Sequence, residues 1–427
     1  MNAQAHQPTV TNKLQVWLLI GSGVIASAQI GKAMISVPLI RADLEFGFAL
    51  AGLVVAVFAT LGAIFGIGAG ALVQRIGLRR ALIGGMGIIA AGNVIGALAP
   101  NAPVLLLGRI VEGVGYFGVV VAVPASIARI AARGDRDFFM AVWTVYMPTG
   151  IMLMLISAPL LAICGWRAFW FASAALAAVS SLVLAVCAAP LPRLSWEQRQ
   201  TFVEDIGKVV AEPRCLLLGL AFFMFACQLY ALTFALPLLL TSQHGVTLSH
   251  AGLMSAAVLL VSAGGHVMSG VLLRRGVPIW AVLMAAFASF TLAGAGVYAG
   301  ELPPAAVALF AALALGLGGL APGALYAAAP RAAPRPSAVP SAIGVLQQAS
   351  GLGQFAGPVV LGIVVQHWGW SAAPAIVIPA ALCGVVAAFA IRNALQWQET
   401  VRIARLPFGR GPGVSDAFRR AACEPGD

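Results

Sequence analysis

The sequence predicts an all-α integral membrane protein with twelve transmembrane helices in two pseudo-symmetric six-helix bundles. Three observations support this fold class: the chain is 61% hydrophobic and only 9% charged, it contains a series of long apolar segments, and one of those segments recurs in the second half. A soluble domain of 427 residues could not bury that much apolar surface in one core.

About 20 apolar residues are needed to span the hydrocarbon core of a bilayer. Segments of about that length occur at 15–38, 48–73, 81–99, 104–128, 138–161, 168–188, 215–240, 251–273, 279–299, 305–328, 341–365 and 372–390. The first segment lacks the pattern of a cleaved signal peptide, so we expect it to remain as a helix.

The second apolar segment has a copy in the second half of the chain. Segments 51–80 and 251–275 align without a gap, and their identical positions include Ala51, Gly52, Leu53, Ala56, Gly70, Leu72 and Arg75, which recur as Ala251, Gly252, Leu253, Ala256, Gly270, Leu272 and Arg275. Such self-similarity indicates two copies of one unit. We therefore expect an N-terminal bundle over 1–189, a cytoplasmic linker over 190–214, a C-terminal bundle over 215–392 and a basic cytoplasmic tail over 393–427.

The linker has apolar residues at helical spacing between residues 196 and 210, with charged residues elsewhere. This pattern favours a helix that lies on the inner membrane surface. Such a helix serves either as a hinge between the halves or as a simple tether.

The distribution of cations predicts the orientation. If the N-terminus is cytoplasmic, only Arg41 and Arg167 lie in outer loops and only Lys32 and Arg109 lie inside spans, while every other one of the 25 cations is on the inside. Positive residues concentrate in cytoplasmic loops, so we expect a bacterial inner (plasma) membrane protein with both termini in the cytoplasm. The net charge of +11 is explained by this topology, and we expect no nucleic-acid partner.

Four local motifs accompany the twelve spans. The turn after the second span contains Gly70, Arg75, Gly77 and Arg79, with Gln74 before the first arginine; the fourth span contains Arg109, Gly113 and Gly115; and Gly165-Trp166-Arg167 and Gly369-Trp370 follow the fifth and eleventh spans. In their order and position these motifs resemble those of the major facilitator superfamily. The resemblance implies the major facilitator fold and a secondary transporter that works by alternating access.

The turn at Gly70 to Arg79 resembles the gating motif of that family, in which the position of Gln74 is usually Asp. Glycine allows a tight turn and close helix approach, and arginine can donate to a helix C-terminus or to a carboxylate. The resemblance implies a cytoplasmic latch, which Gln74 would weaken because an amide cannot form an ion pair. The alternative is that these arginines only set topology.

The branch within the family is indicated by two further features. The fifth span carries Ala158-Pro159-Leu160-Leu161 where drug/proton antiporters have a Gly-Pro pair, which argues against drug efflux. The cation at Lys32 and the run Pro148-Thr149-Gly150 are similar to the cyanate/nitroimidazole-type permeases.

A polar stripe runs down the first span through Ser22, Gln29, Lys32 and Ser36. A charge inside a bilayer costs at least about 2.5 kcal/mol, so each such group is a candidate site. Lys32 and Arg109 both lie about 9 Å from the outer ends of their spans at 1.5 Å per residue. Two cations at one depth predict an anion-binding site, with Gln29 beside Lys32. Snorkelling of Lys32 toward the outer headgroups is the alternative.

Glu112 lies three residues after Arg109 and is the one acidic residue that we expect inside a span. Residues three apart share a helix face, so Glu112 either forms a structural pair with Arg109 or leaves Arg109 to bind substrate. Glu112 is also the leading candidate for proton coupling. His266 is the second candidate because histidine titrates near neutral pH; the alternative, which we favour for this residue, is a hydrogen-bonded packing histidine.

Aromatic and amide side chains occur near the middle of several spans. They include Tyr116, Tyr146, Gln228 and Gln354, which we expect to contact a small, partly apolar solute. Each of these residues taken singly could instead bind helices together.

We therefore expect a monomeric secondary transporter that takes up a small organic or inorganic anion together with protons. The alternative is a proton-coupled exporter of drugs or metabolites. An enzyme is not expected, since the sequence has no P-loop, no HExxH and no Cys/His cluster. We expect no cofactor and no metal, and the lipid bilayer and the solute as the partners.

Overall fold

The computed structural model describes residues 11–66, 73, 76–143, 145–187, 207–300, 302–335 and 338–404 of the chain. The helices of the first half are α1 (Lys13–Leu44), α2 (Phe48–Ala56), η1 (Val57–Ala59), α3 (Thr60–Phe65), α5 (Leu78–Ala97), α6 (Ala102–Ile130), α7 (Arg133–Trp143), α8 (Tyr146–Ile156) and α9 (Ala158–Cys187). Those of the second half are α11 (Pro213–Ser242), α12 (Leu248–Arg274), α13 (Ile279–Val297), α14 (Pro304–Gly318), α15 (Leu320–Ala332), α16 (Val339–Trp368), η3 (Trp370–Ala372) and α17 (Pro374–Ala404).

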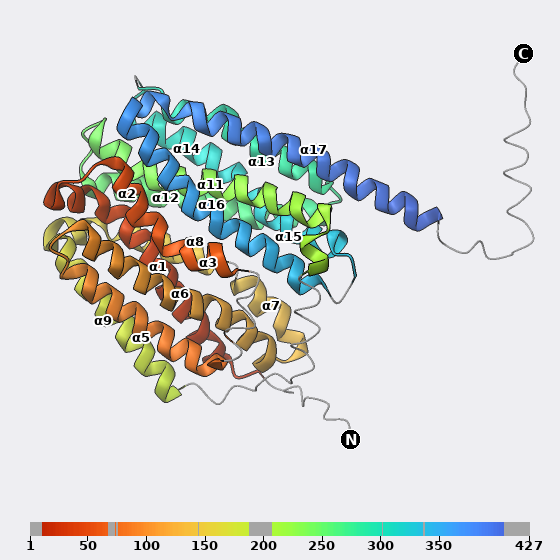
Figure 1. Ribbon diagram of the computed structural model, residues 1–427, viewed down its shortest axis with the longest axis horizontal. Helices are drawn as coiled ribbons and strands as arrows, with labels where there is room; N and C mark the ends of the chain where they lie inside the picture. The colour runs from red at the N-terminus through yellow and green to blue at the C-terminus, as the bar shows by residue number, and fades with distance from the viewer. Residues whose placement is uncertain are drawn as a thin grey trace, which may run out of the picture.

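The fold class is confirmed: the described elements are helices that lie roughly side by side, with α1 to α9 forming one group and α11 to α17 the other (Figure 1). Eleven helical segments of the described residues are long and apolar enough to cross a membrane. The twelfth span is the predicted fifth one, which is divided among α7, α8 and the first turns of α9. The many exposed large apolar side chains, such as Ile163 and Leu292, suit a surface in contact with lipid.

Local sequence explains where several helices begin. Asn12, Asn101 and Thr247 precede α1, α6 and α12, and their side chains accept hydrogen bonds from the backbone N–H groups of Gln15, Val104 and His250. Such caps satisfy donors that the first turn of a helix leaves free. Polar residues between apolar segments therefore fix the ends of the spans.

The predicted last span is shorter than the observed helix. We expected it to end near Ala390 and an irregular tail to begin at 393, but α17 continues to Ala404. The tail prediction beyond residue 404, and most of the predicted linker helix over 196–210, lie outside the described residues.

The two halves pack against each other through repeated glycines. A Cβ built on Gly52 of α2 would lie 2.2 Å from the carbonyl oxygen of Pro358 in α16. The equivalent Gly252 of α12 lies against α8 and α9, where a Cβ would be 2.3 Å from the Cβ of Ala158. The repeat seen in the sequence therefore places a backbone-to-backbone crossing on each side of the interface between the halves.

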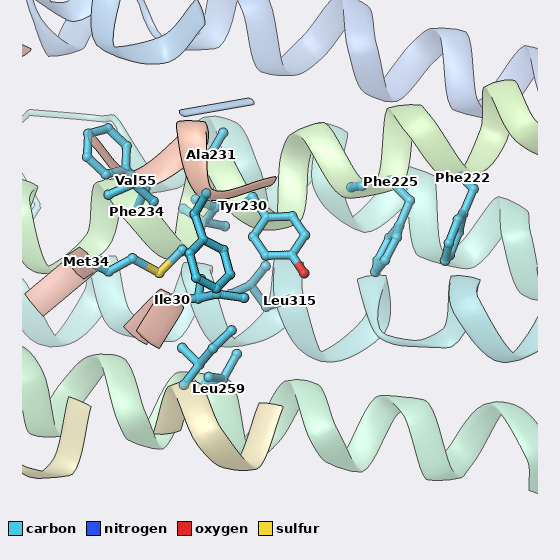
Figure 2. Packing of buried hydrophobic residues seen from close by; sticks show 14 of the residues in the cluster. Ile30, Met34, Val55, Phe222, Phe225, Tyr230, Ala231, Phe234, Leu259 and Leu315 are labelled. Carbon is cyan, nitrogen blue, oxygen red and sulfur yellow. The ribbon is translucent and has the colours of Figure 1, made fainter. Parts of the chain in front are cut away.

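Apolar side chains fill the space between these crossings. Ile30 and Met34 of α1 lie beside Tyr230 and Phe234 of α11, and all four are buried in one continuous cluster (Figure 2). Close packing of this kind leaves little room for added volume.

We predict that Gly52→Ala lowers the thermal stability of the purified protein, because the new methyl group would overlap the Pro358 carbonyl. Overpacking of this kind costs about 1–3 kcal/mol. The matched control is Gly62→Ala in α3, where a Cβ would meet no atom within 4 Å and helix propensity favours alanine. Thermal unfolding in detergent measures both, and equal stability of the two variants would contradict the crossing.

Candidate functional site

Three charged side chains meet inside the first half, on α1 and α6. Lys32 Nζ lies 2.9 Å from Glu112 Oε1, and Arg109 Nη1 bonds the other carboxylate oxygen, Glu112 Oε2. All three side chains have zero solvent exposure. The carboxylate thus joins the two cations that the sequence placed at one depth.

Arg109 is also held by the backbones of two neighbouring helices. Its Nε donates to the carbonyl oxygen of Val54 in α2, and its Nη1 donates to that of Gln29 in α1, each at 3.1 Å. The Phe58 ring covers the guanidinium, with Cζ 4.6 Å from the ring centroid. Arg109 therefore ties α6 to α1 and α2, and its Nη2 has no hydrogen-bond partner among the described residues.

Lys32 of α1 contacts side chains of α5 and α9. Its Nζ donates to Asn93 Oδ1 in α5 and lies 3.7 Å from the centroid of the Trp170 ring in α9. Trp170 Nε1 donates to Ser36 Oγ at 3.2 Å, which fixes the indole beside the ammonium group. Amide, carboxylate and aromatic face together replace the water that an ammonium ion loses on burial.

Small residues bring these helices close enough for the contacts. A Cβ on Gly92 of α5 would lie 2.6 Å from the backbone nitrogen of Glu112, and one on Gly108 of α6 would lie 2.8 Å from the backbone nitrogen of Gly96. Gly113 similarly lies against the backbone of Phe58. The fourth-span glycines therefore act by letting α6 approach α5 and the α2 region.

The group formed by Lys32, Glu112, Arg109 and Asn93, which we call the charge network, contains two basic side chains and one carboxylate, a formal excess of one positive charge when all three are ionised. An enclosed excess charge is costly in a low-dielectric interior, because each ion loses its hydration. Among the described residues, Glu112 is the carboxylate that contacts both cations. A change in its protonation therefore changes the charge of the whole network.

Aromatic side chains continue from the charge network toward the second half. The Phe58 and Tyr116 rings are 4.6 Å apart, the Tyr116 and Tyr146 hydroxyl oxygens are 3.5 Å apart, and Tyr146 stacks on Trp143 at 3.9 Å. Across the interface, Tyr230 Oη of α11 lies 2.7 Å from Met147 Sδ of α8. Tyr116 and Tyr146, both predicted to contact substrate, are thus neighbours near the seam between the halves.

The predicted amide groups are buried and only partly satisfied. Gln29 Nε2 donates to Ile25 O, and Gln228 Nε2 donates to Met224 O, while the Oε1 atoms of both side chains have no partner among the described residues. Gln354 is buried in α16 with 7% exposure. Gln29 and Gln228 therefore each keep a buried amide oxygen that can still accept a hydrogen bond.

His266 lies apart from the charge network, on α12 in the second half. Its Nδ1 is 2.8 Å from the carbonyl oxygen of Ser262, one turn earlier in the same helix. Gly319, at the break between α14 and α15, makes room for the ring, since a Cβ there would be 3.0 Å from Nδ1. This geometry suits the packing interpretation of His266, and the proton-carrier interpretation remains a prediction.

The predicted gating turn is described only in part. Gly70, Gln74 and Arg75 lie outside the described residues, whereas Gly77 has a left-handed φ of 94° at the start of α5. Arg79 Nη2 donates to the carbonyl oxygen of Ala185, near the C-terminus of α9, at 2.6 Å. A cation at a helix C-terminus is favourable, as the sequence interpretation anticipated for this arginine.

The family model described as Major Facilitator Superfamily matches residues 19–335 and 218–419. The chain belongs to the major facilitator superfamily. It is therefore a secondary transporter and not an enzyme, and the resemblance stated from the motifs is confirmed at the level of the superfamily.

Curated members of the superfamily are similar to parts of the chain. Inner membrane transport protein YajR of Escherichia coli K12 is 28% identical over 193 residues, which cover 44% of this chain and 42% of that protein. The multidrug transporter mfsC of Aspergillus fumigatus is 28% identical over 188 residues, covering 43% and 35%, and Polyol transporter 5 of Arabidopsis thaliana is 26% identical over 143 residues, covering 33% and 26%. The chain thus spans less than half the length of each of these relatives.

Solved structures of major facilitator transporters share the fold. A bacterial homolog of the human lysosomal transporter Spinster, inward-facing and unoccupied, has a TM-score of 0.68 at 17% identity, covering 90% of this chain and 95% of that one. A mutant of the nucleoside transporter NupG has a TM-score of 0.68 at 16% identity, covering 89% and 99%. The bundle geometry described above is therefore that of the major facilitator fold.

Three residues that contact Lys32 or Arg109 were not predicted from the sequence. Asn93, Trp170 and Phe58 complete the surroundings of Lys32 and Arg109. Asn93 could have been found, because an amide inside the third span meets the same rule that selected Lys32. The two aromatic residues had no such signal, since apolar spans contain many of them.

We predict that Glu112→Gln destabilises the protein, because it leaves Lys32 and Arg109 buried without a carboxylate. Breaking a buried ion pair costs about 3–5 kcal/mol. The control is Glu212→Gln, which removes the partly exposed pair with Arg214 and should cost less than about 1 kcal/mol.

The same prediction extends to a double variant. Lys32→Met combined with Glu112→Gln should recover part of the lost stability, because one buried cation is removed with the carboxylate. Chemical unfolding in detergent measures each variant, and a double variant no more stable than Glu112→Gln alone would count against charge balance as the cause.

Proposed function

We propose that this transporter carries a small organic or inorganic anion into the cell, by alternating access and with the cotransport of protons. The observation that carries the proposal is the excess positive charge of the charge network, buried within a transmembrane bundle. An enclosed positive charge attracts an anion strongly, because the surrounding dielectric screens it little.

The proposed solute site lies where the two halves meet, next to the charge network. Its contacts are Tyr116 and Tyr146 from the first half and Gln228 and Gln354 from the second, with Gln29, Lys32 and Arg109 supplying amide and charge. Tyrosine hydroxyls and amide N–H groups can donate to an anion, and their apolar parts suit a small organic body.

Proton coupling follows from the position of Glu112 between the two cations. When Glu112 is ionised, it neutralises one cation and holds Lys32 and Arg109 in place. When it is protonated, the network gains one positive charge and its hold on the cations weakens. Protonation of Glu112 and binding of an anion therefore favour each other, which is the linkage that a symporter requires. His266 is the second candidate for the titrating group.

Energetics favour symport for uptake of an anion. The negative interior of a cell opposes entry of each negative charge by about 2.3 kcal/mol per 100 mV. Each proton carried inward with the anion offsets that cost. The proposed orientation is that of a bacterial inner membrane protein with both termini in the cytoplasm. In it, the turn at Gly70 to Arg79 acts as the inner latch.

A second candidate function is export of drugs or metabolites in exchange for protons. The names of similar proteins favour it, since one relative is called a multidrug transporter. The single carboxylate of the charge network and the absence of the antiporter Gly-Pro pair from the fifth span argue for uptake of an anion. The direction of proton-driven flux distinguishes the two functions.

We predict that Lys32→Ala abolishes anion uptake by proteoliposomes, because it removes a cation of the charge network. Lys13→Ala is the matched control, since it removes an exposed cation from the same helix, and it should retain uptake. Correct insertion of both variants is checked by protease accessibility. Uptake at the wild-type rate by Lys32→Ala would refute the anion site.

We also predict that an inward proton gradient accelerates anion uptake by the wild-type protein. In the fraction of Glu112→Gln that folds and inserts, the amide mimics the protonated carboxyl, so exchange of anion should persist while its dependence on the proton gradient is lost. The measurement is uptake of radiolabelled anion with and without the gradient, and stimulated efflux of dyes instead would favour the exporter.

A further inference from the structure

Two cavities lie at the same end of the bundle, and the internal repeat relates them. One, of about 460 Å³, is lined by Asp43, Trp166 and Arg167 in the first half. The other, of about 350 Å³, is lined by Gln243, Trp370 and Ser371 in the second half. The α1–α2, α11–α12 and α16–α17 turns gather at this end of the molecule (Figure 1).

Backbone geometry shows that the two cavities are equivalent. The turns after α1 and α11 contain Glu45 and Gly245, which both adopt a left-handed conformation, with φ of 51° and 62°. The tryptophans of both cavities follow a glycine, Gly165 or Gly369, with φ of 76°. Asp43 therefore corresponds to Gln243, Trp166 to Trp370 and Arg167 to Ser371.

The cavity of the first half carries its own ion pair. Trp166 Nε1 donates to Asp43 Oδ2 at 3.2 Å, and Arg167 Nη1 bonds the same oxygen. The guanidinium of Arg167 lies 4.3 Å from the centroid of the Trp166 ring, and its Nη2 donates to Ala99 O at 3.1 Å. Every polar group at this indole is therefore satisfied by the chain itself.

The cavity of the second half lacks both members of that pair. With Gln243 and Ser371 in their places, Trp370 Nε1 has no acceptor among the described residues, and neither does the nearby Tyr298 hydroxyl. Both side chains are more than nine-tenths buried, and both line the cavity. A buried donor without a partner is costly, at about 1–3 kcal/mol, unless something supplies an acceptor.

Aromatic faces complete this second cavity. The Trp370 ring stacks on Tyr298 at 6.4 Å and meets Phe48 edge to face at 5.6 Å. Ala299, the counterpart of Ala99, also lines the cavity. The second cavity therefore keeps the tryptophan and the alanine of the first, with Ala299 O accepting from Leu302 N at 3.3 Å, but has neither the carboxylate nor the arginine.

We infer that the cavity of the second half binds a small solute that carries both a carboxylate and a guanidinium group. The carboxylate takes the place of Asp43 and accepts from the Trp370 indole N–H. The cation takes the place of Arg167, over the Trp370 face and near the Ala299 carbonyl, where cation–π attraction and hydrogen bonding hold it. A cavity of about 350 Å³ accommodates a molecule the size of an amino acid.

Occupancy of this cavity bears on the transport cycle. Phe48 begins α2 in the first half, whereas Trp370, Tyr298 and Gln243 belong to the second, so a bound solute contacts both halves. Ala49 N also donates to Gln366 Oε1 of α16 across this seam, at 2.9 Å. A solute bound here stabilises the arrangement in which α2 packs against α16, since it binds that state more tightly than a separated one.

L-arginine is the probe for this inference, because it carries both missing groups. Isothermal titration of the purified full-length chain in detergent should show binding of L-arginine. L-citrulline, in which a neutral urea group replaces the guanidinium, and agmatine, which lacks the carboxylate, should each bind at least about tenfold more weakly, as expected from loss of one charged contact. Equal binding of all three, or no binding of L-arginine, would overturn the inference.

Two variants locate the binding. Trp370→Phe keeps the aromatic face but removes the indole N–H, so affinity should fall about tenfold. Gln243→Asp combined with Ser371→Arg rebuilds the pair of the first half inside the cavity, so binding of L-arginine should be lost while thermal stability rises. Unchanged binding by the double variant would refute this location.

Lys32→Ala separates this inference from the proposed anion site. That variant should bind L-arginine as the wild type does, because Lys32 does not line the cavity. If Lys32→Ala abolished binding, L-arginine would be occupying the transport site and the inference would fail, whereas the anion proposal would stand.

Discussion

The charge network places the strongest physical constraint on the first half. Two cations and one carboxylate are enclosed between α1, α2, α5, α6 and α9, so each helix must supply a group that replaces lost hydration. The glycines of α5 and α6 serve the same constraint, because the contacts require backbones to approach closely. In this bundle the contacts of the buried charges therefore depend on the close packing of the helices.

The proposed transport mechanism depends on the position of Glu112 within the charge network. Glu112 holds both cations, so in the proposed mechanism the gain or loss of one proton would alter contacts to α1, α2 and α5 at once. A buried group of this kind can act as a switch because the low dielectric makes its two charge states very different in energy. The aromatic residues from Phe58 to Tyr146 connect that switch to the seam between the halves.

The sequence was sufficient for the fold but only partly for the site. Span length, cation distribution and the repeat depend on local composition, and all are readable without coordinates. The pairing of Arg109 with Glu112 was anticipated because three residues separate them on one helix. The contact between Lys32 and Glu112 was not, since it joins α1 to α6 and depends on how the helices rotate in the bundle. Trp170 gave no signal because aromatic residues are common in apolar spans, whereas Asn93 could have been selected as a polar residue inside a span.

The paired glycine crossings carry an implication for the history of the molecule. Gly52 and Gly252 occupy equivalent positions and perform the same task, each letting a helix of one half touch the backbone of the other. The charged residues of the charge network and of the first-half cavity have no such correspondence: Gln243 is the counterpart of Asp43, Ser371 of Arg167 and Leu232 of Lys32. The close crossing is therefore a feature that both repeats share, whereas the side chains proposed to bind solutes differ between them. Substitutions at those side chains would leave the crossings between the halves unchanged.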